Sequence, residues 1–426
     1  MQYLIFSVFG ILFHMFLKQY KLGDKIKVLI LILITLILLD FFGGYGRGQT
    51  VIIFFLIPFI FFEYHNISIF KRYIMIFMFG LFLSMLSSQY FRGQKIMTSL
   101  PVYTDLFAII YYFFVKSLNP KIEILEKVLL VLIILFIGIY IISYFTYPDG
   151  IFSRIFIGEQ RDYGEDVRIR IMGQGLASLG YFFALNKLLL QKRKNVLYIA
   201  ILFACALIIF LMGFRTILAF LVPFTIYLVY KCYGFSGRLL RMSILSIIAI
   251  IIFINIPIID EKINFILDRN KNENFQNEDY VRIAQFIYFT HDHFKNGIEY
   301  MLGSGLPQLG NEEFNIKASQ YGIYMQGLVD NGINWVDFGL LSMSWMVGLL
   351  PIVTLIAYCI KAIRLNVRKE YLYVGIWFLF LVIISFTTME AIRPGNLALH
   401  AIGLVLVELA SKDLIIFKRK LKYINH

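Results

Sequence analysis

Arginine, rather than lysine, is the basic residue that recurs in one of the two sets of connectors between the apolar stretches of this chain. A guanidinium group presents a planar array of donors that can bind a phosphate or carboxylate through two hydrogen bonds at once. These arginines therefore indicate recognition of an anionic ligand. The alternative is that each one forms a salt bridge with acids of its own connector, such as Asp162 or Glu165. The set comprises Arg47, Arg92, Arg154, Arg161, Arg168, Arg170, Arg215, Arg282 and Arg393.

The composition shows what kind of elements must position these arginines. Of the 426 residues, 59% are hydrophobic and 16% are charged, and the mean hydropathy is +0.76. Water-soluble domains are far more polar than this. The apolar stretches are long and continuous, as in residues 129–145, whereas the strands of a membrane barrel would be shorter and would alternate. The sequence therefore predicts an all-α polytopic integral membrane protein with a single membrane domain over residues 1–426.

The apolar pattern predicts about 13 transmembrane helices, within a range of roughly 12 to 14. The third and fifth of them could be tilted or partly re-entrant. The predicted spans cover residues 2–17, 26–42, 49–62, 72–88, 101–116, 124–146, 171–190, 197–213, 215–231, 239–258, 338–360, 371–388 and 397–412.

Lysine and arginine in the connectors predict the orientation of these spans. One alternate set of connectors, together with the C-terminal tail, holds 25 of the 40 basic residues. Because basic residues accumulate in cytoplasmic loops, that set is expected inside, with the N-terminus outside and the C-terminus in the cytoplasm. The same distribution accounts for the net charge of +13 without nucleic acid, because the basic residues are scattered over short loops rather than gathered on one face.

Two connectors on the outer side are long or strongly charged. Residues 259–337 form a large extracytoplasmic loop, which would cover much of a site on that side. Within it, an amphipathic helix is expected over about 279–296, with Gly297 as its stop. Its apolar stripe would contain Ile283, Phe286, Ile287 and Phe294. Residues 148–170 form a second, densely charged outer loop.

Several motifs that would specify other chemistry do not occur in the sequence. There is no GxxxxGK[ST] phosphate loop, so ATP hydrolysis is disfavoured. No HExxH, paired CxxC or DxD motif occurs, so no metal or other cofactor is expected. His291 and His293 lie two residues apart and would point to different faces of a helix, which argues against a metal pair.

Four segments in order along residues 165–350 resemble the O-antigen polymerase and O-antigen ligase superfamily of bacterial surface-polysaccharide assembly. Residues 168–175 (RIRIMGQG) are similar to an R-x-x-G segment that enters a span, and 213–221 (GFRTILAFL) are similar to an S-R-T-like hairpin. Residues 280–286 (YVRIAQF) and 303–310 (GSGLPQLG) resemble the arginine and the G-x-G of the large loop. Residues 337–350 (DFGLLSMSWMVGLL) resemble the span that follows. Ligases tend to have His where this chain has Asp337, so the polymerases fit better.

The resemblance implies a glycosyl transfer at the outer face of the bacterial cytoplasmic (inner) membrane. The donor would be a glycan chain on undecaprenyl pyrophosphate and the acceptor a single lipid-linked repeat unit. The apolar helices would hold the two prenyl tails, with membrane lipids as further partners, and the loop over 259–337 would be periplasmic. A chain-length regulator protein is a partner implied by the family.

The residues suggest roles in such a reaction. Guanidinium groups stabilise the negative charge that a leaving pyrophosphate gathers, and an acidic group can take the proton of the acceptor hydroxyl. Asp337 and Arg282 are therefore the candidates for catalysis, and Glu390 is a second candidate base. The candidates for binding pyrophosphate or glycan are Arg161, Arg168, Arg170, Arg215, Arg393 and Glu390.

Each of these roles has a structural alternative. Arg215 could anchor a hairpin at the headgroups, Arg282 could pair with Glu278, and Asp337 could cap the next span. The glycines of 303–310 could serve simply to form a turn, without a role in a site. For the whole protein, the alternatives are a ligase that transfers glycan to lipid A core and a lipid-linked oligosaccharide flippase or other transporter. The chain shows no internal repeat and places few charges inside the spans, which disfavours a transporter.

Overall fold

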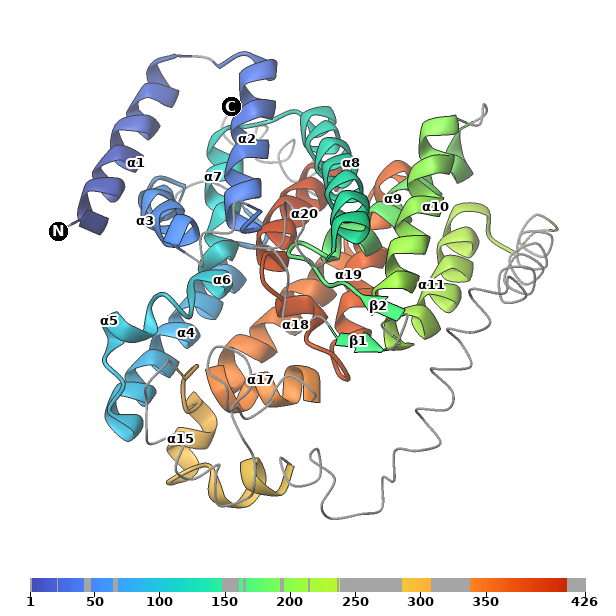
Figure 1. Cartoon of the computed structure of the whole chain (residues 1–426). Helices are drawn as coiled ribbons and strands as arrows, with labels where there is room; N and C mark the ends of the chain where they lie inside the picture. The colour runs from blue at the N-terminus through green and yellow to red at the C-terminus, as the bar shows by residue number, and fades with distance from the viewer. Residues whose placement is uncertain are drawn as a thin grey trace.

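The computed structural model describes residues 2–20, 22–41, 47–63, 68–147, 161–163, 166–191, 195–213, 215–235, 237, 286–307 and 338–411. Within these ranges the chain is almost entirely helical, which confirms the predicted all-α class (Figure 1). The longer helices are α1 (Gln2–Gln19), α2 (Asp24–Leu38), α3 (Arg47–Phe62), α4 (Lys71–Arg92), α8 (Ile122–Thr146), α9 (Gly175–Leu190), α10 (Val196–Leu211), α11 (Arg215–Tyr233), α17 (Gly339–Val347), α18 (Leu349–Arg364), α19 (Leu372–Ile384) and α20 (Asn396–Ala410). Shorter helices are α5 (Ile96–Ser99), α6 (Thr104–Phe107), η1 (Ala108–Ile110), α7 (Tyr111–Ser117), η3 (Tyr288–Asp292), α15 (Gly297–Leu302), η5 (Lys369–Tyr371) and η6 (Glu390–Ile392).

Every predicted span in the described part of the chain coincides with helix, and only 239–258 lies outside the described residues. Three helices are long and apolar enough to cross a membrane, judged by length and composition: Lys71–Arg92, Ile122–Thr146 and Thr216–Tyr233. Other apolar helices, such as α9 and α10, are shorter. The fifth predicted span is built from three consecutive short helices, α6, η1 and α7, rather than from one regular helix.

The eleventh predicted span, 338–360, is divided at Gly348 into α17 and α18. In a continuous helix the carbonyls of Trp345 and Met346 would accept from the N–H groups four residues later. Here they accept from the backbone N–H groups of Ser304 (2.9 Å) and Gly305 (2.8 Å), which belong to the large loop. An inserted piece of chain therefore takes the place of the next helical turn, and this ends α17.

The charged loop over 148–170 contains a hairpin that the sequence did not predict. Strand β1 (Arg161–Tyr163) pairs antiparallel with β2 (Asp166–Arg168). Its register places Arg161 directly opposite Arg168.

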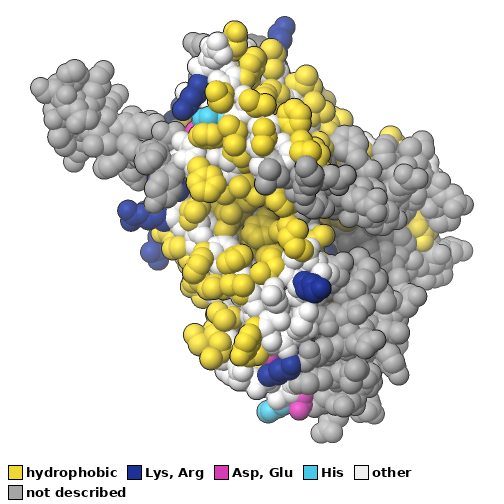
Figure 2. Space-filling view, turned by 90° about the vertical axis from the view of Figure 1, so that its left-hand side faces the viewer, with side chains coloured by type: hydrophobic (Ala, Val, Ile, Leu, Met, Phe, Trp, Pro, Cys, Tyr) yellow, Lys and Arg dark blue, Asp and Glu magenta, His cyan; other side chains and the backbone are white. Residues whose placement is uncertain are grey.

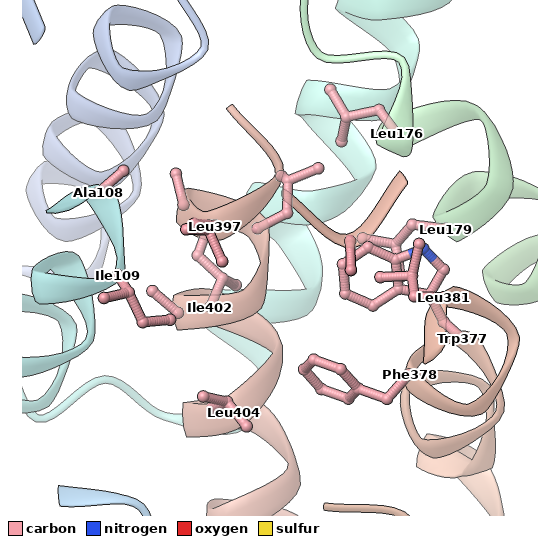
Figure 3. Packing of buried hydrophobic residues seen from close by; sticks show 14 of the residues in the cluster. Ala108, Ile109, Leu176, Leu179, Trp377, Phe378, Leu381, Leu397, Ile402 and Leu404 are labelled. Carbon is pink, nitrogen blue, oxygen red and sulfur yellow. The ribbon is translucent and has the colours of Figure 1, made fainter. Parts of the chain in front are cut away.

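The centre of the fold is α20, which is buried on all sides between α7, α8, α18 and α19 (Figure 1). A helix that is apolar around its whole circumference belongs inside a bundle. Figure 3 shows this packing from close by: Leu397, Ile402 and Leu404 of α20 face residues of η1 on one side and Trp377 and Phe378 of α19 on the other.

One side of the molecule exposes a broad apolar surface. Figure 2 shows hydrophobic side chains over most of the height of the described part of this face, with a few Lys and Arg side chains at its top, along its left edge and in its lower half. On α4 the exposed residues Ile76, Phe79, Phe82 and Leu86 recur every three or four positions, while Phe77 and Leu81 are buried. A water-soluble helix would present polar residues on its exposed stripe.

Connectors far apart in the sequence gather at two ends of the bundle. At one of them, which we call the loop end, lie residues 38–41, 47–50, 87–105, 169–175, 286–307, 338–340 and 385–396, as the contacts below show. In Figure 1 this end is towards the bottom, where α15 lies, whereas the end of α1 and the start of α2 are at the top.

At the opposite end of the bundle, lysine–carboxylate pairs join the ends of different helices. Lys187 binds Glu126 at 2.5 Å, and Lys116 binds the buried Glu408 at 2.8 Å. Lys121 binds Asp24 at 3.0 Å, and this hydrogen bond raises the pKa of the exposed Lys121 ammonium. None of these lysines belongs to the connectors that gather at the loop end.

The helix predicted over 279–296 differs from the observed structure in its register and in its end. Residues 279–285 lie outside the described residues, and Tyr288–Asp292 form a π-helix, in which His293 N–H bonds Tyr288 O at 2.8 Å. A π-turn rotates the side chains relative to an α-helical pattern. Phe286, which the prediction placed on the apolar stripe, is 44% exposed, whereas Tyr288 and Phe289 are buried. Gly297 does not stop this helix but begins α15, because the Asn296 side chain caps the N–H groups of Ile298 and Glu299.

Candidate functional site

The candidate site at the loop end is built around a buried cluster of Arg393, Glu390 and Gln174. The Nε of Arg393 lies 2.6 Å from the Glu390 carboxylate. The side-chain amide of Gln174 is oriented so that its oxygen faces donors and its nitrogen faces acceptors. In this orientation the oxygen accepts from Nε and Nη1 of Arg393, both at 2.7 Å. The side chains of Arg393 and Glu390 are only 11% and 2% exposed. A charged group at such depth must be paired, and these two residues pair with each other.

Close backbone approach joins the start of α9 to the start of α20 beside this cluster. The Cα of Gly175 faces the Asn396 side chain so closely that a Cβ there would overlap it. The Asn396 amide in turn donates to the backbone carbonyl of Glu390. Gly175 is therefore the residue that lets the segment 169–175 reach the turn that carries Glu390 and Arg393.

The turn between η6 and α20 is also held from its other side. The Asp105 carboxylate accepts from the Gln49 amide at 2.8 Å and from the backbone N–H of Gly395. Gln49 donates as well to the backbone carbonyl of Leu38 at 2.9 Å. These contacts tie the ends of α2, α3 and α6 to the turn two residues after Arg393.

The residues that follow the large loop in the sequence, at the start of α17, contact the same turn. The N–H of Leu340 donates to Ser385 O at 2.7 Å, and the Ser385 hydroxyl accepts from the N–H of Ala391 at 2.8 Å. Gly339 also lies against the carbonyls of Ser385 and Thr388. The residues that follow position 337 are thus joined to the turn that contains Glu390.

A second buried cluster anchors the described part of the large loop, residues 286–307, to α4. The Arg92 Nε binds the Glu299 carboxylate at 2.5 Å, and both side chains are fully buried. Arg92 also donates to the carbonyl of His293, and Glu299 accepts from the N–H of Lys295 at 2.6 Å. Arg92 therefore forms a salt bridge, which is the structural alternative to anion binding given above for these arginines. Its partner, however, lies in a different connector.

The backbone of residues 303–306 enters the bundle between α4 and α17. Gly303 O accepts from Ser87 Oγ at 2.6 Å, and the N–H of Leu306 donates to the Tyr103 hydroxyl at 3.1 Å. Ser304 is fully buried. These glycines do more than make a turn, because a Cβ on Gly303 would overlap Met346 O and Gly348 N. Non-helical backbone inside an apolar bundle is tolerated where the protein satisfies its polar groups, as it does here.

The structure brings together some of the predicted site residues and not others. Arg393 and Glu390 form one cluster, and Arg170 lies four residues before their partner Gln174, half-buried between Ile169 and Ile171. Of Arg161, Arg168 and Arg215 only the backbone is described: the first two are paired in the hairpin, and Arg215 is the first residue of α11. Arg282 and Asp337, the two catalytic candidates, lie outside the described residues.

Sequence reasoning missed Gln174, Asn396 and Asp105 as contributors to this end of the molecule. Gln174 lies inside the RIRIMGQG segment, whose arginines drew attention because of their charge. A neutral amide gives no charge signal, and its partner Arg393 is more than two hundred residues away.

Among the described ranges, no group of three or more His, Cys, Asp and Glu residues could hold a metal ion.

Comparison of the chain with protein-family models, with curated proteins and with solved structures finds no match.

Proposed function

We propose that this chain is a membrane glycosyltransferase that polymerises lipid-pyrophosphate-linked oligosaccharide units at the outer face of the bacterial cytoplasmic membrane. About 13 spans would cross the bilayer, with the N-terminus outside and the C-terminus in the cytoplasm. Undecaprenyl-pyrophosphate-linked glycans would be donor and acceptor, and neither a metal nor another cofactor would take part. The proposal rests on the sequence resemblance together with the physical features of the loop end.

The observation that carries the proposal is the convergence of arginine-bearing connectors at one end of an apolar bundle. Residues 169–175 and 390–396 meet through Gln174 and Arg393, and residues 338–340 join the same turn through Ser385. Each of these segments borders a candidate for binding or catalysis. Their meeting agrees with a single site made from several connectors, which is what a transfer between two lipid-linked substrates requires.

The exposed apolar surface supports the membrane part of the proposal. Its residues on α1 and α4 would face lipid, because continuous apolar surface of this extent is costly in water. On α15, Ile298 and Met301 are exposed one turn apart while Glu299 is buried, as expected of a short interfacial helix. The membrane lipids are therefore proposed partners at the loop end as well.

Within this mechanism the described residues would act through charge and position. A leaving pyrophosphate gathers negative charge, and guanidinium groups held in place beforehand stabilise that charge without reorganising. Arg393 is held by Glu390 and Gln174, and Arg170 lies four residues before Gln174 in the segment that leads into α9. Asp337 would take the proton of the acceptor hydroxyl. The ion pair with Arg393 gives Glu390 a role in orienting the guanidinium.

A transporter of lipid-linked oligosaccharides is the second candidate, favoured by one observation. A helix interrupted inside the bundle, as at Gly348, is a recurrent feature of substrate sites in transporters. Here, however, the carbonyls freed by that interruption are used by residues 304 and 305, which fix a loop.

Deletion of the gene in the host is expected to leave single repeat units on the final acceptor of the polysaccharide. A polymerase is needed to lengthen the glycan but not to export or attach it. The chain-length pattern of the extracted polysaccharide on a gel checks this. Complementation with the intact chain provides the control and should restore long chains. If no unit at all reaches the acceptor, the protein is a ligase or a flippase.

The orientation can be tested with two exposed positions at opposite ends of the bundle. His291→Cys should react with a membrane-impermeant maleimide in spheroplasts, whereas Lys25→Cys should react only after permeabilisation, because the bilayer separates them. The native Cys205, Cys232 and Cys359 are buried and would be replaced by alanine to provide the background. Labelling with the reverse pattern would overturn the orientation and the outer location of the site.

A further inference from the structure

We infer that Gln174 is a positioning residue for Arg393, which holds the guanidinium in the orientation that the proposed pyrophosphate-dependent transfer needs. This inference rests on the proposed function and adds a residue that carries no charge. It is carried by the contacts of Gln174, by its place at the start of α9 and by the charge balance of the cluster.

The contacts of the Gln174 side chain are directed at the arginine rather than at its own helix. Gln174 is the residue immediately before α9, where a side chain commonly caps the first N–H groups. Its side chain makes no capping hydrogen bond. Instead its oxygen accepts from both Nε and Nη1 of Arg393, at 2.7 Å each. The local helix therefore does not explain this buried amide, which is 3% exposed.

Two acceptors together fix the guanidinium plane. Glu390 approaches Nε at 2.6 Å from η6, while Gln174 approaches from α9, so the arginine is held between two separate elements. An ion pair alone leaves the guanidinium free to rotate about the pair, whereas a second acceptor from another helix removes that freedom. Gly175 and Asn396 hold the two elements together at this point.

The charge of the three groups explains why the second acceptor is an amide. Arg393 and Glu390 balance each other, and Gln174 adds an acceptor without adding charge. A carboxylate at position 174 could make the same hydrogen bonds but would leave the cluster net negative. Such a cluster would repel an anionic substrate. Geometry and charge can therefore be tested separately at this one position.

The test uses the purified full-length protein in liposomes with lipid-linked repeat units, and inorganic pyrophosphate as an inhibitor. Gln174→Met keeps the side-chain length but removes the acceptor. It should lower kcat/KM by about 10- to 100-fold, mainly through kcat, because a misplacement of about 1 Å has effects of that order. Gln174→Glu should keep kcat near that of the wild type but raise both KM and the inhibition constant of pyrophosphate. Arg393→Met is the reference for complete loss of the guanidinium.

Ser178→Ala is the matched control. Ser178 lies one turn further along α9, is equally buried, and bonds Trp377 rather than the cluster. It should leave both kinetic constants and the pyrophosphate inhibition unchanged. An equal loss in Ser178→Ala would show that packing of α9 is responsible and would overturn the inference.

Two further outcomes separate the inference from the proposed function. If Gln174→Met has the kinetic constants of the wild type while Arg393→Met is impaired, the inference is overturned and the proposed function stands. A wild-type protein that does not polymerise the units would remove the proposed function and this inference with it. Should Gln174→Met fail to fold, the KM and inhibition constant of Gln174→Glu decide, and unchanged values would contradict the inference.

Discussion

Arg92→Met is expected to destabilise the protein by about 3–5 kcal/mol, the range found when one partner of a buried ion pair is removed. The Glu299 carboxyl would lose its cationic partner in a fully buried site, with only the N–H of Lys295 left among the partners described above. The carbonyl of His293 would lose its donor as well. Because these contacts attach residues 293–299 to α4, the loop end should loosen before the rest of the bundle does. Thermal unfolding in detergent, followed by size-exclusion chromatography, measures the loss.

A double-mutant cycle shows whether the loss comes from the unpaired charge. Replacing both partners, as Arg92→Met with Glu299→Leu, should recover part of the stability, because well-packed apolar residues can replace a buried pair at little cost. Lys121→Met is the control: its pair with Asp24 has side chains 71% and 53% exposed, and solvent screens such a pair so strongly that its loss should change the stability little. A single variant as stable as the wild type would contradict the anchoring role of Arg92.

Gly303→Ala is expected to cost about 3 kcal/mol or more, through two effects that add. Gly303 has φ of 87°, a conformation that an L-residue with a Cβ rarely adopts. The new methyl group would also overlap the backbone at Met346 and Gly348, where no side chain can move aside. The inserted segment 303–306 should therefore be displaced, and the carbonyls of Trp345 and Met346 would lose their donors.

Thermal unfolding checks this prediction, and limited proteolysis after residue 302 reports whether the inserted segment has left the bundle. Gly297→Ala is the control, because a Cβ at that position meets nothing within 4 Å and alanine is a better helix former. It should leave the protein as stable as the wild type or slightly more stable. If both alanine variants unfold at the wild-type temperature, residues 303–306 are not packed between α4 and α17 in the way described.

The sequence by itself determined the helical class and the places of the helices. Both follow from composition and from the length of apolar runs, which are local properties that each segment carries independently of its neighbours. For that reason each predicted span within the described residues contains helix, even where a span is divided. The sequence also predicts which connectors lie on the same side, because charge can be counted without knowing any contact.

The tertiary structure decided which residues meet, because those contacts join positions far apart in the chain. The partner of Arg92 is 207 residues away, and nothing in the pattern around either residue indicates the other. The division at Gly348 depends on donors that arrive from residues 304 and 305, and the π-turn at 288–292 shifts the apolar stripe by a local change of hydrogen bonding. The candidate site also depends on a contact that the sequence pattern does not show. Its arginines can be identified from their charge, whereas the neutral Gln174 can be identified only from its distance to Arg393 in the folded protein.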